Sequence, residues 1–264
     1  MPLGSVELKD WEICLVVCPC NLADQTILYS KINPLGEFMR ANIKQIILSV
    51  LILIMARPVY SDQEIKALEP NFKLNGRSMV DLSEAWWKWS MSIPGDENPV
   101  SDITGNHCGE GQKGNVWFLA GGFGSSKIKR SCVIPSAKYL FFPIINMAYW
   151  PREEKSDFTC IDAIANSALN NDTAIDLFVE VDGVSINDLK KFRARTKKCF
   201  DIFERMPKAF NSYKAYPSAS DGYWLLFKPF KKGKHQIKFG GRYNKDSSAY
   251  GKMVQDIEYE ITIK

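Results

Sequence analysis

The sequence is poor in the residues and motifs on which many enzymes and nucleic-acid-binding proteins depend. It has only two histidines, His107 and His235, in 264 residues, and it lacks both a Gly-x-Ser-x-Gly motif and a Cys-x-x-Cys pair. Without them, neither a nucleophile-elbow hydrolase nor a zinc site finds support. The net charge of +4 is small for this length, whereas dedicated nucleic-acid-binding domains carry a larger basic excess. We therefore expect no nucleic-acid partner.

Long hydrophobic runs are also missing, since a bilayer-spanning helix needs about 20 apolar residues. The longest run, 46–56, instead has the length of the apolar core of a secretory signal. Two positive charges precede it at Arg40 and Lys44, and the small residues Val59 and Ser61 follow it at the spacing of a signal-peptidase site. The sequence therefore predicts export to the periplasm or the extracellular space, with cleavage after Ser61.

The predicted leader divides the chain into three parts. Met39 is the natural start of the leader, because a start at the first residue would give a charged region of unusual length. We interpret 1–38 as an over-extended upstream segment, 39–61 as the signal peptide and 62–264 as a single mature domain. Two alternatives stay open: the upstream segment is translated and removed with the leader, or 43–56 is a buried core helix. After cleavage we do not expect an integral membrane protein.

Cleavage would reduce the cysteine count from seven to four, and an exported chain meets an oxidising compartment. Four cysteines allow three pairings. We favour Cys108–Cys132 and Cys160–Cys199, because sequence neighbours pair easily and each pair brackets its own block. The chain-entropy model assigns about 3.5 and about 4 kcal/mol to these two bonds. A zinc site is the weaker alternative, and no cofactor is expected apart from the calcium weighed below.

The mature part has the pattern of a mainly β protein. Polar and apolar residues alternate through 175–181 and again through 253–263, as they do in strands with one buried face. The segments 116–120 and 223–227 are apolar throughout, which indicates strands that are buried on both faces. For 116–120 this suggests a central strand. We predict an antiparallel β-sandwich with two accessory α-helices.

The two helices are predicted at 78–93 and 157–169. Ser78 and Asp81 have the spacing of a capping box at the start of the first helix. That helix carries three tryptophans, Trp86, Trp87 and Trp89. We interpret them as packing on a sheet, with an aromatic sugar-binding platform as the alternative. The apolar residues expected to line one face of the second helix are Phe158, Ile161, Ala165 and Leu169.

Three blocks of the mature part have a distinctive order of residues. They are WW…NP..D.TG..C…VWFLAG between 86 and 121, C.IP…FFP..N between 132 and 146, and SDGYW…G.H between 220 and 235. Together these blocks resemble an uncharacterised family of exported bacterial β-sandwich proteins. The resemblance implies bacterial export and a shared fold, and it brings no activity and no catalytic residues.

Polar side chains gather in the long loop 94–114 and at the ends of apolar strands. They are Asp102, Asn106, Glu110, Asn146 and Asp221. Carboxylate and amide oxygens are ligands of Ca²⁺ and hydrogen-bond to sugars. We therefore treat the five as a candidate ligand-binding or calcium site. The alternative is that Asp102 and Asp221 form Asx-type turns and cap strand ends.

The sharpest charge feature is a basic run at 190–198. In an extended chain, one face of this run carries Lys191, Arg193, Arg195 and Lys197. Such a stripe could meet anionic lipids, anionic glycans or nucleic acid. The favoured alternative is an edge strand whose charge protects it from aggregation.

No residue pattern in the sequence predicts a catalytic centre. The sequence favours an exported, non-catalytic binding protein or cell-envelope protein. Such a protein would recognise a glycan, an envelope component or a partner protein. The alternative is an extracellular hydrolase with loop 94–114 as its mouth. A histidine beside a carboxylate in a deep pocket would favour the hydrolase, whereas a shallow aromatic or basic surface would favour binding.

Overall fold

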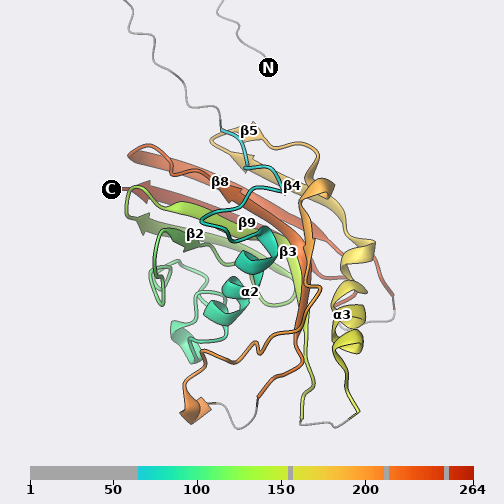
Figure 1. Cartoon of the computed structure of the whole chain (residues 1–264). Coiled ribbons are helices and arrows are strands. Elements are labelled where there is room, and N and C mark those ends of the chain that lie inside the picture. The colour runs from blue at the N-terminus through green and yellow to red at the C-terminus, as the bar shows by residue number, and fades with distance from the viewer. Residues whose placement is uncertain (1–64, 154–156, 211–213, 247–249) are drawn as a thin grey trace, which may run out of the picture. The chain divides into compact units, whose positions relative to one another are not determined.

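The computed structural model describes residues 65–153, 157–210, 214–246 and 250–264 (Figure 1). The described residues all belong to one compact unit, Gln63–Lys264. The predicted upstream segment 1–38 and signal peptide 39–61 lie outside the described residues. Both stay predictions.

The strands of the described residues form two sheets (Figure 1). The four-stranded sheet has, in spatial order, β1 (Val116–Phe118), β3 (Tyr139–Tyr149), β7 (Ala219–Phe227) and β6 (Arg193–Arg195). The five-stranded sheet has, in spatial order, β2 (Ser126–Ile134), β9 (Val254–Ile263), β8 (Gly233–Arg242), β4 (Ile175–Val181) and β5 (Val184–Ser185). The prediction of a mainly β fold is confirmed.

The sheets are mixed and not purely antiparallel: the predicted antiparallel pairing is found in five of the seven strand pairs of the described residues, and two pairs are parallel. β1 pairs with β3 in parallel, and β2 pairs with β9 in parallel. The reason is that β2, which follows β1 in the chain, joins the other sheet. The chain then returns to the first sheet in the direction of β1, and no hairpin can form between β1 and β3.

β1 is an edge strand, not the central strand that its apolar sequence suggested. Its residues are nonetheless buried, because both of its faces are covered. Its outer edge is closed by the Gln112 side chain. The Gln112 amide nitrogen donates to the Phe118 carbonyl at 2.8 Å, and the Gln112 amide oxygen accepts from the Phe118 N–H at 2.9 Å.

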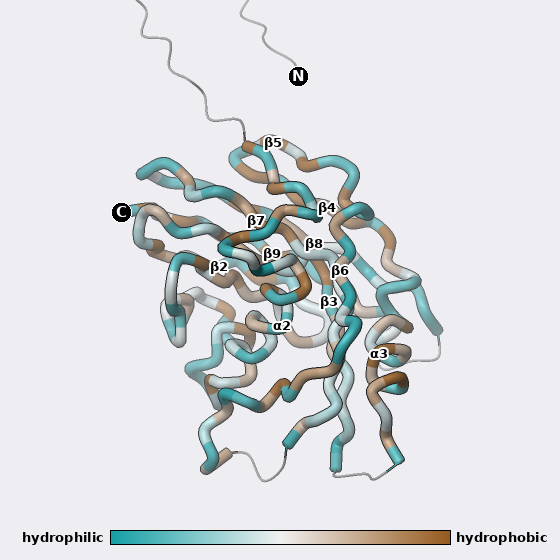
Figure 2. The backbone as a smooth tube through the Cα atoms, in the orientation of Figure 1, coloured by the Kyte–Doolittle hydropathy of each residue, from teal (hydrophilic) through white to brown (hydrophobic). Residues whose placement is uncertain are grey.

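The two sheets pack face to face on a shared apolar core. Phe142 of β3 lies 4.6 Å from Phe239 of β8, measured between ring centroids, and also stacks on Phe227. On the opposite face of the four-stranded sheet, Phe141, Trp224 and neighbouring residues form a second core beneath α2. The four-stranded sheet is therefore a middle layer, which explains why every residue of β7 is buried. Figure 2 shows the contrasting alternation of polar and apolar residues along β9, whose outer face is polar.

Helix α2 (Met79–Ser90) begins as its sequence predicts. The Ser78 side chain accepts from the Asp81 N–H, and the Asp81 carboxylate accepts from the Ser78 N–H. All three tryptophans are buried, which confirms a helix packed on a sheet and leaves no exposed aromatic platform there. The Trp87 indole nitrogen donates to the Ser220 hydroxyl of β7 at 2.8 Å, and this bond fixes the helix on the sheet.

Helix α3 (Cys160–Ala168) is shorter than predicted and buries a different face. Its start is capped by Thr159 and Asp162 in the same reciprocal way as α2. Ile161 is 79% exposed, whereas Ala163 and Ser167 are buried. The small residues face inward because they let the helix approach the sheet closely, and the disulfide at Cys160 fixes its rotation.

Both predicted disulfides are confirmed, Cys108–Cys132 and Cys160–Cys199. The first joins the long loop before β1 to strand β2. The second joins the start of α3 to the segment after β6. Each bond therefore ties irregular chain to a regular element.

Candidate functional site

Asp102 organises the long loop between α2 and β1. One carboxylate oxygen accepts from the Thr104 N–H at 2.7 Å, and the other accepts from the His107 N–H at 2.9 Å. Burial raises the pKa of Asp102, but hydrogen bonds from Thr104, His107 and Gly105 outweigh it and lower the pKa to about 2. These bonds are those of an Asx-type turn, the alternative that the sequence left open.

The five residues of the predicted ligand site are not brought together around one point. Asn106 and Glu110 are exposed, and the backbone carbonyl of Glu110 accepts from the Trp89 indole. Asp221 is fully buried in ion pairs, and Asn146 lies in β3 opposite Gly222. Within the described ranges, no group of three or more histidine, cysteine or acidic residues could hold a metal ion.

Most of the basic stripe is engaged with carboxylates. Lys191 pairs with Glu69, while Arg193 and Arg195 both pair with Asp221. Arg193 and Arg195 lie in β6, which is an edge strand of the four-stranded sheet. Lys197 is exposed. The structure thus joins two features that the sequence kept separate: a proposed ligand carboxylate neutralises two proposed anion-binding arginines.

Sequence reasoning missed Arg130, which is 1% exposed and holds loop 94–114 in place. Its guanidinium donates to the backbone carbonyls of Asp102 at 2.6 Å, Ala120 at 2.9 Å and Val100 at 3.3 Å. It also contacts the Tyr259 hydroxyl at 3.2 Å. A buried cation is tolerated because carbonyl dipoles surround it. In the sequence, Arg130 is only one more charge in an alternating strand.

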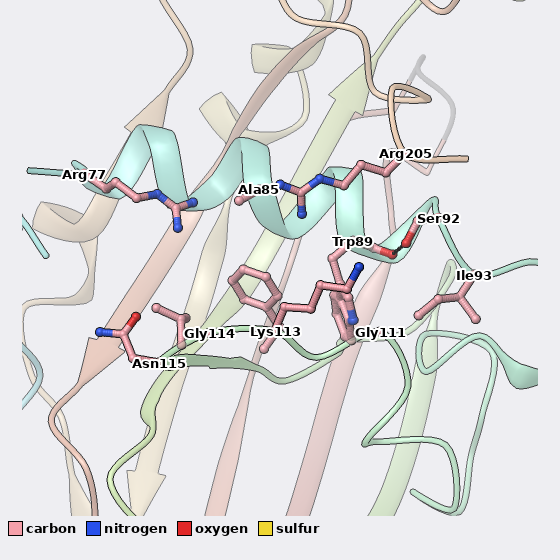
Figure 3. Close-up of a pocket in the computed structure, with 12 residues that line it drawn as sticks. Arg77, Ala85, Trp89, Ser92, Ile93, Gly111, Lys113, Gly114, Asn115 and Arg205 are labelled. Atoms are coloured by element: carbon pink, nitrogen blue, oxygen red, sulfur yellow. Dashed lines mark hydrogen bonds between the residues drawn. The ribbon is translucent and has the colours of Figure 1, made fainter. Parts of the chain in front are cut away.

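A cleft of about 980 Å³ lies between α2 and the segment that leads into β1 (Figure 3). Its floor is apolar and consists of Ala85 and Trp89 from α2 and Val116 and Phe118 from β1. The Trp89 and Phe118 ring centroids are 5.4 Å apart. Both elements are fixed by the buried core beneath them, so the cleft has a rigid base.

The walls of this cleft are positively charged. Figure 3 shows Arg77 and Arg205 beside α2, with Lys113 and Asn115 along the opposite side. All four side chains belong to exposed residues. No acidic residue, histidine or cysteine is among the described residues that line the cleft. The arrangement can therefore bind an anion but offers no general base from its lining.

The cleft cations use little of their hydrogen-bonding capacity within the described part of the chain. Arg77 donates to the Asp81 backbone carbonyl at 3.3 Å. Lys113 and Arg205 form no ion pair with any other residue that the structure describes. The preceding residue, Glu204, pairs with Lys88 of α2 and so anchors the segment that carries Arg205.

Neither histidine lies in this cleft. His235 has both ring nitrogens engaged, with Nδ1 2.6 Å from an Asp182 carboxylate oxygen and Nε2 2.8 Å from the Lys231 carbonyl. This histidine–carboxylate pair lies beside the β4–β5 turn. His107 is partly buried in loop 94–114, where its backbone N–H bonds to Asp102.

Comparison of the chain with protein-family models, curated proteins and solved structures finds no match. The resemblance to an exported bacterial family therefore stays a prediction. Among the described residues, no helix has the length and apolar character needed to cross a membrane.

Proposed function

We propose that this protein is an exported binding protein that recognises an acidic glycan in the cleft beside α2. The observation that carries the proposal is the set of three exposed cations, Arg77, Lys113 and Arg205, around a cleft without acidic lining residues. Guanidinium groups pair well with carboxylate, sulfate and phosphate groups because their donors match the geometry of these anions.

The shape of the cleft and its neutral polar groups support a carbohydrate as the ligand that carries the anionic group. Its volume of about 980 Å³ is at the upper end of the range for small-molecule sites, enough for more than one sugar ring. Ser92 and Asn115 line it as uncharged partners for hydroxyl groups. The partly exposed Ile93 also lines the cleft and provides an apolar surface against which the less polar face of a sugar ring can lie.

Export is part of the same proposal. The two disulfides use all four cysteines that the predicted mature chain retains. Disulfides persist mainly in oxidising compartments, which include the periplasm and the extracellular space. The predicted leader at 39–61 and the family resemblance point the same way.

The test is a binding measurement with defined acidic glycans. Isothermal titration calorimetry with a heparin hexasaccharide and with a galacturonate hexamer compares sulfate with carboxylate, and cellohexaose provides a neutral control. We expect the acidic sugars to bind and the affinity to fall with added salt, because screening weakens exposed charges. Equal binding of cellohexaose would contradict a charge-selective cleft.

Two triple variants separate the cleft from general charge. Arg77→Gln, Lys113→Gln and Arg205→Gln together should weaken acidic-glycan binding at least tenfold. The matched control replaces Lys197, Lys198 and Lys234 by Gln, which lowers the net charge equally at exposed residues outside the cleft lining. The control should bind as the parent chain does. Equal losses in the two variants would show that binding follows net charge and not the cleft.

A further inference from the structure

A second, smaller pocket lies against other residues of α2. It has a volume of about 160 Å³ and is bounded by Trp86 and Trp87 of α2, by the turn 121–124 and by Asn146 and Ala148 of β3. An engineered apolar cavity of about 150 Å³ binds benzene, so the pocket can hold a group of roughly that size. It shares no lining residue with the electropositive cleft.

One polar group of this pocket has an unused hydrogen bond. The Asn146 amide nitrogen is buried and has no partner among the described residues. It lies beside Gly222, where an added Cβ would stand only 2.7 Å from the Asn146 Cβ. Glycine at 222 thus lets Asn146 lie close to β7. Buried amide donors are normally paired, so this donor is free to bond to an acceptor that a ligand brings.

The turn 121–124, which bounds this pocket, is held by Gln255. Its side-chain oxygen accepts from the Gly122 N–H at 3.3 Å, and its nitrogen donates to the Gly122 carbonyl at 2.5 Å and to the Gly124 carbonyl at 3.3 Å. The turn is therefore fixed by a buried side chain. A pocket with fixed walls binds without the cost of ordering them.

Exposed aromatic residues line the same pocket. Phe123 is 58% exposed and Tyr250 is 60% exposed, and both belong to its lining. Large exposed aromatics beside a pocket are typical of a ligand site, because they bury much area for little conformational entropy.

We propose that this pocket binds the acetamido group of an N-acetylated sugar. The acetamido methyl group fills the apolar space against Trp86 and Trp87, and the acetamido oxygen accepts from the Asn146 amide nitrogen. The sugar ring stays at the mouth, against Phe123. The site is separate from the charged cleft, because the two share no lining residue.

The experiment compares two neutral sugars that differ at one substituent per ring. Tri-N-acetylchitotriose carries acetamido groups where cellotriose carries hydroxyls. Titration calorimetry should show at least tenfold tighter binding of the acetylated sugar. Saturation-transfer NMR should give the strongest signal on the acetamido methyl protons. Equal affinity for the two sugars, or no saturation of those protons, would overturn the proposal.

Variants assign the binding to the pocket. Asn146→Leu removes the donor at similar volume and should weaken chitotriose binding at least tenfold without lowering the urea midpoint. Asn106→Leu, at an exposed asparagine, is the matched control and should bind normally. The triple cleft variant Arg77→Gln, Lys113→Gln and Arg205→Gln should also keep chitotriose binding. Normal binding by folded Asn146→Leu would overturn the assignment, and if that variant does not fold, the NMR result on the parent chain decides.

Discussion

Asp221 of β7 accepts two hydrogen bonds from the guanidinium of Arg193, at 2.9 Å from Nε and 2.8 Å from Nη2. Arg195 adds a third at 2.7 Å from its Nε. The hydrogen bond to Asp221 raises the pKa of Arg193 above its ordinary value, although burial opposes the shift. Bidentate pairs of this kind are strong and directional. They fasten the short edge strand β6 to the buried strand β7.

We expect Asp221→Asn to lower the free energy of unfolding by about 2–4 kcal/mol. The loss is large because Asp221 is fully buried and two guanidiniums would lose their counter-charge, and it is moderated because both arginines are partly exposed. Urea unfolding followed by tryptophan fluorescence measures it. Asp172→Asn, at the exposed partner of the same arginines, should cost less than about 1 kcal/mol. Equal losses of unfolding free energy in the two variants would contradict the role of Asp221 as the main partner of both arginines.

Gly105 allows the long loop to lie against β2. Its φ is +91°, and a Cβ there would stand 2.2 Å from the Ser131 backbone oxygen. We therefore expect Gly105→Ala to destabilise the fold by about 3 kcal/mol or more, through backbone strain and overlap. Thermal unfolding monitored by circular dichroism tests this. Gly109→Ala is the control, since nothing lies within 4 Å of its added Cβ. A midpoint unchanged by Gly105→Ala would show that the loop moves freely.

The ionisation of Asp102 makes the free energy of unfolding depend on pH in the acidic range. Its folded pKa of about 2 lies below its ordinary 3.8, so the folded state favours the carboxylate. The contribution, about 2 kcal/mol, is fully present above pH 4 and is lost as the pH falls through 4 toward 2. The stability gap between the parent chain and Asp102→Asn should therefore shrink over that range. Urea midpoints at pH 7, 4 and 2.5 measure the gap, with Asp96→Asn as an exposed control. A constant gap would refute the assignment.

The two disulfides should differ slightly in their contribution. They close loops with sequence separations of 24 and 39, for which chain entropy gives about 3.5 and about 4 kcal/mol. Serine pairs at Cys108 and Cys132, and at Cys160 and Cys199, should each lose stability of that order. Urea unfolding with and without reductant checks this: reductant should lower the midpoint of the parent chain and of each double variant. A parent midpoint unaffected by full reduction would contradict the prediction.

Local features of the fold were predictable from the sequence. The capping box at Ser78 and Asp81 depends on residues three positions apart, and the alternation in β4 and β9 depends on a period of two. Such signals can be recognised in the sequence because each depends only on residues within one helix or strand. The disulfide pairing was also predictable, since each pair joins neighbouring blocks of the chain.

Other features depend on tertiary context. The parallel pairing of β1 with β3 follows from β2 leaving the sheet, which no local pattern records. The buried face of α3 is set by the Cys160–Cys199 bond and by small residues. The prediction that Ile161 lies on the buried face was therefore wrong. The cleft cations Arg77, Lys113 and Arg205 come from three distant segments. Only folding brings them to one side of α2.

Gln112 gives β1 a property beyond its own sheet. The outward-pointing N–H and carbonyl of Phe118 are those that a strand from another molecule would pair with, and one amide side chain occupies both. An apolar strand at a sheet edge would otherwise be a template for self-association. The Gln112 side chain thus blocks the edge of β1 against pairing with a strand of another molecule, even at high protein concentration.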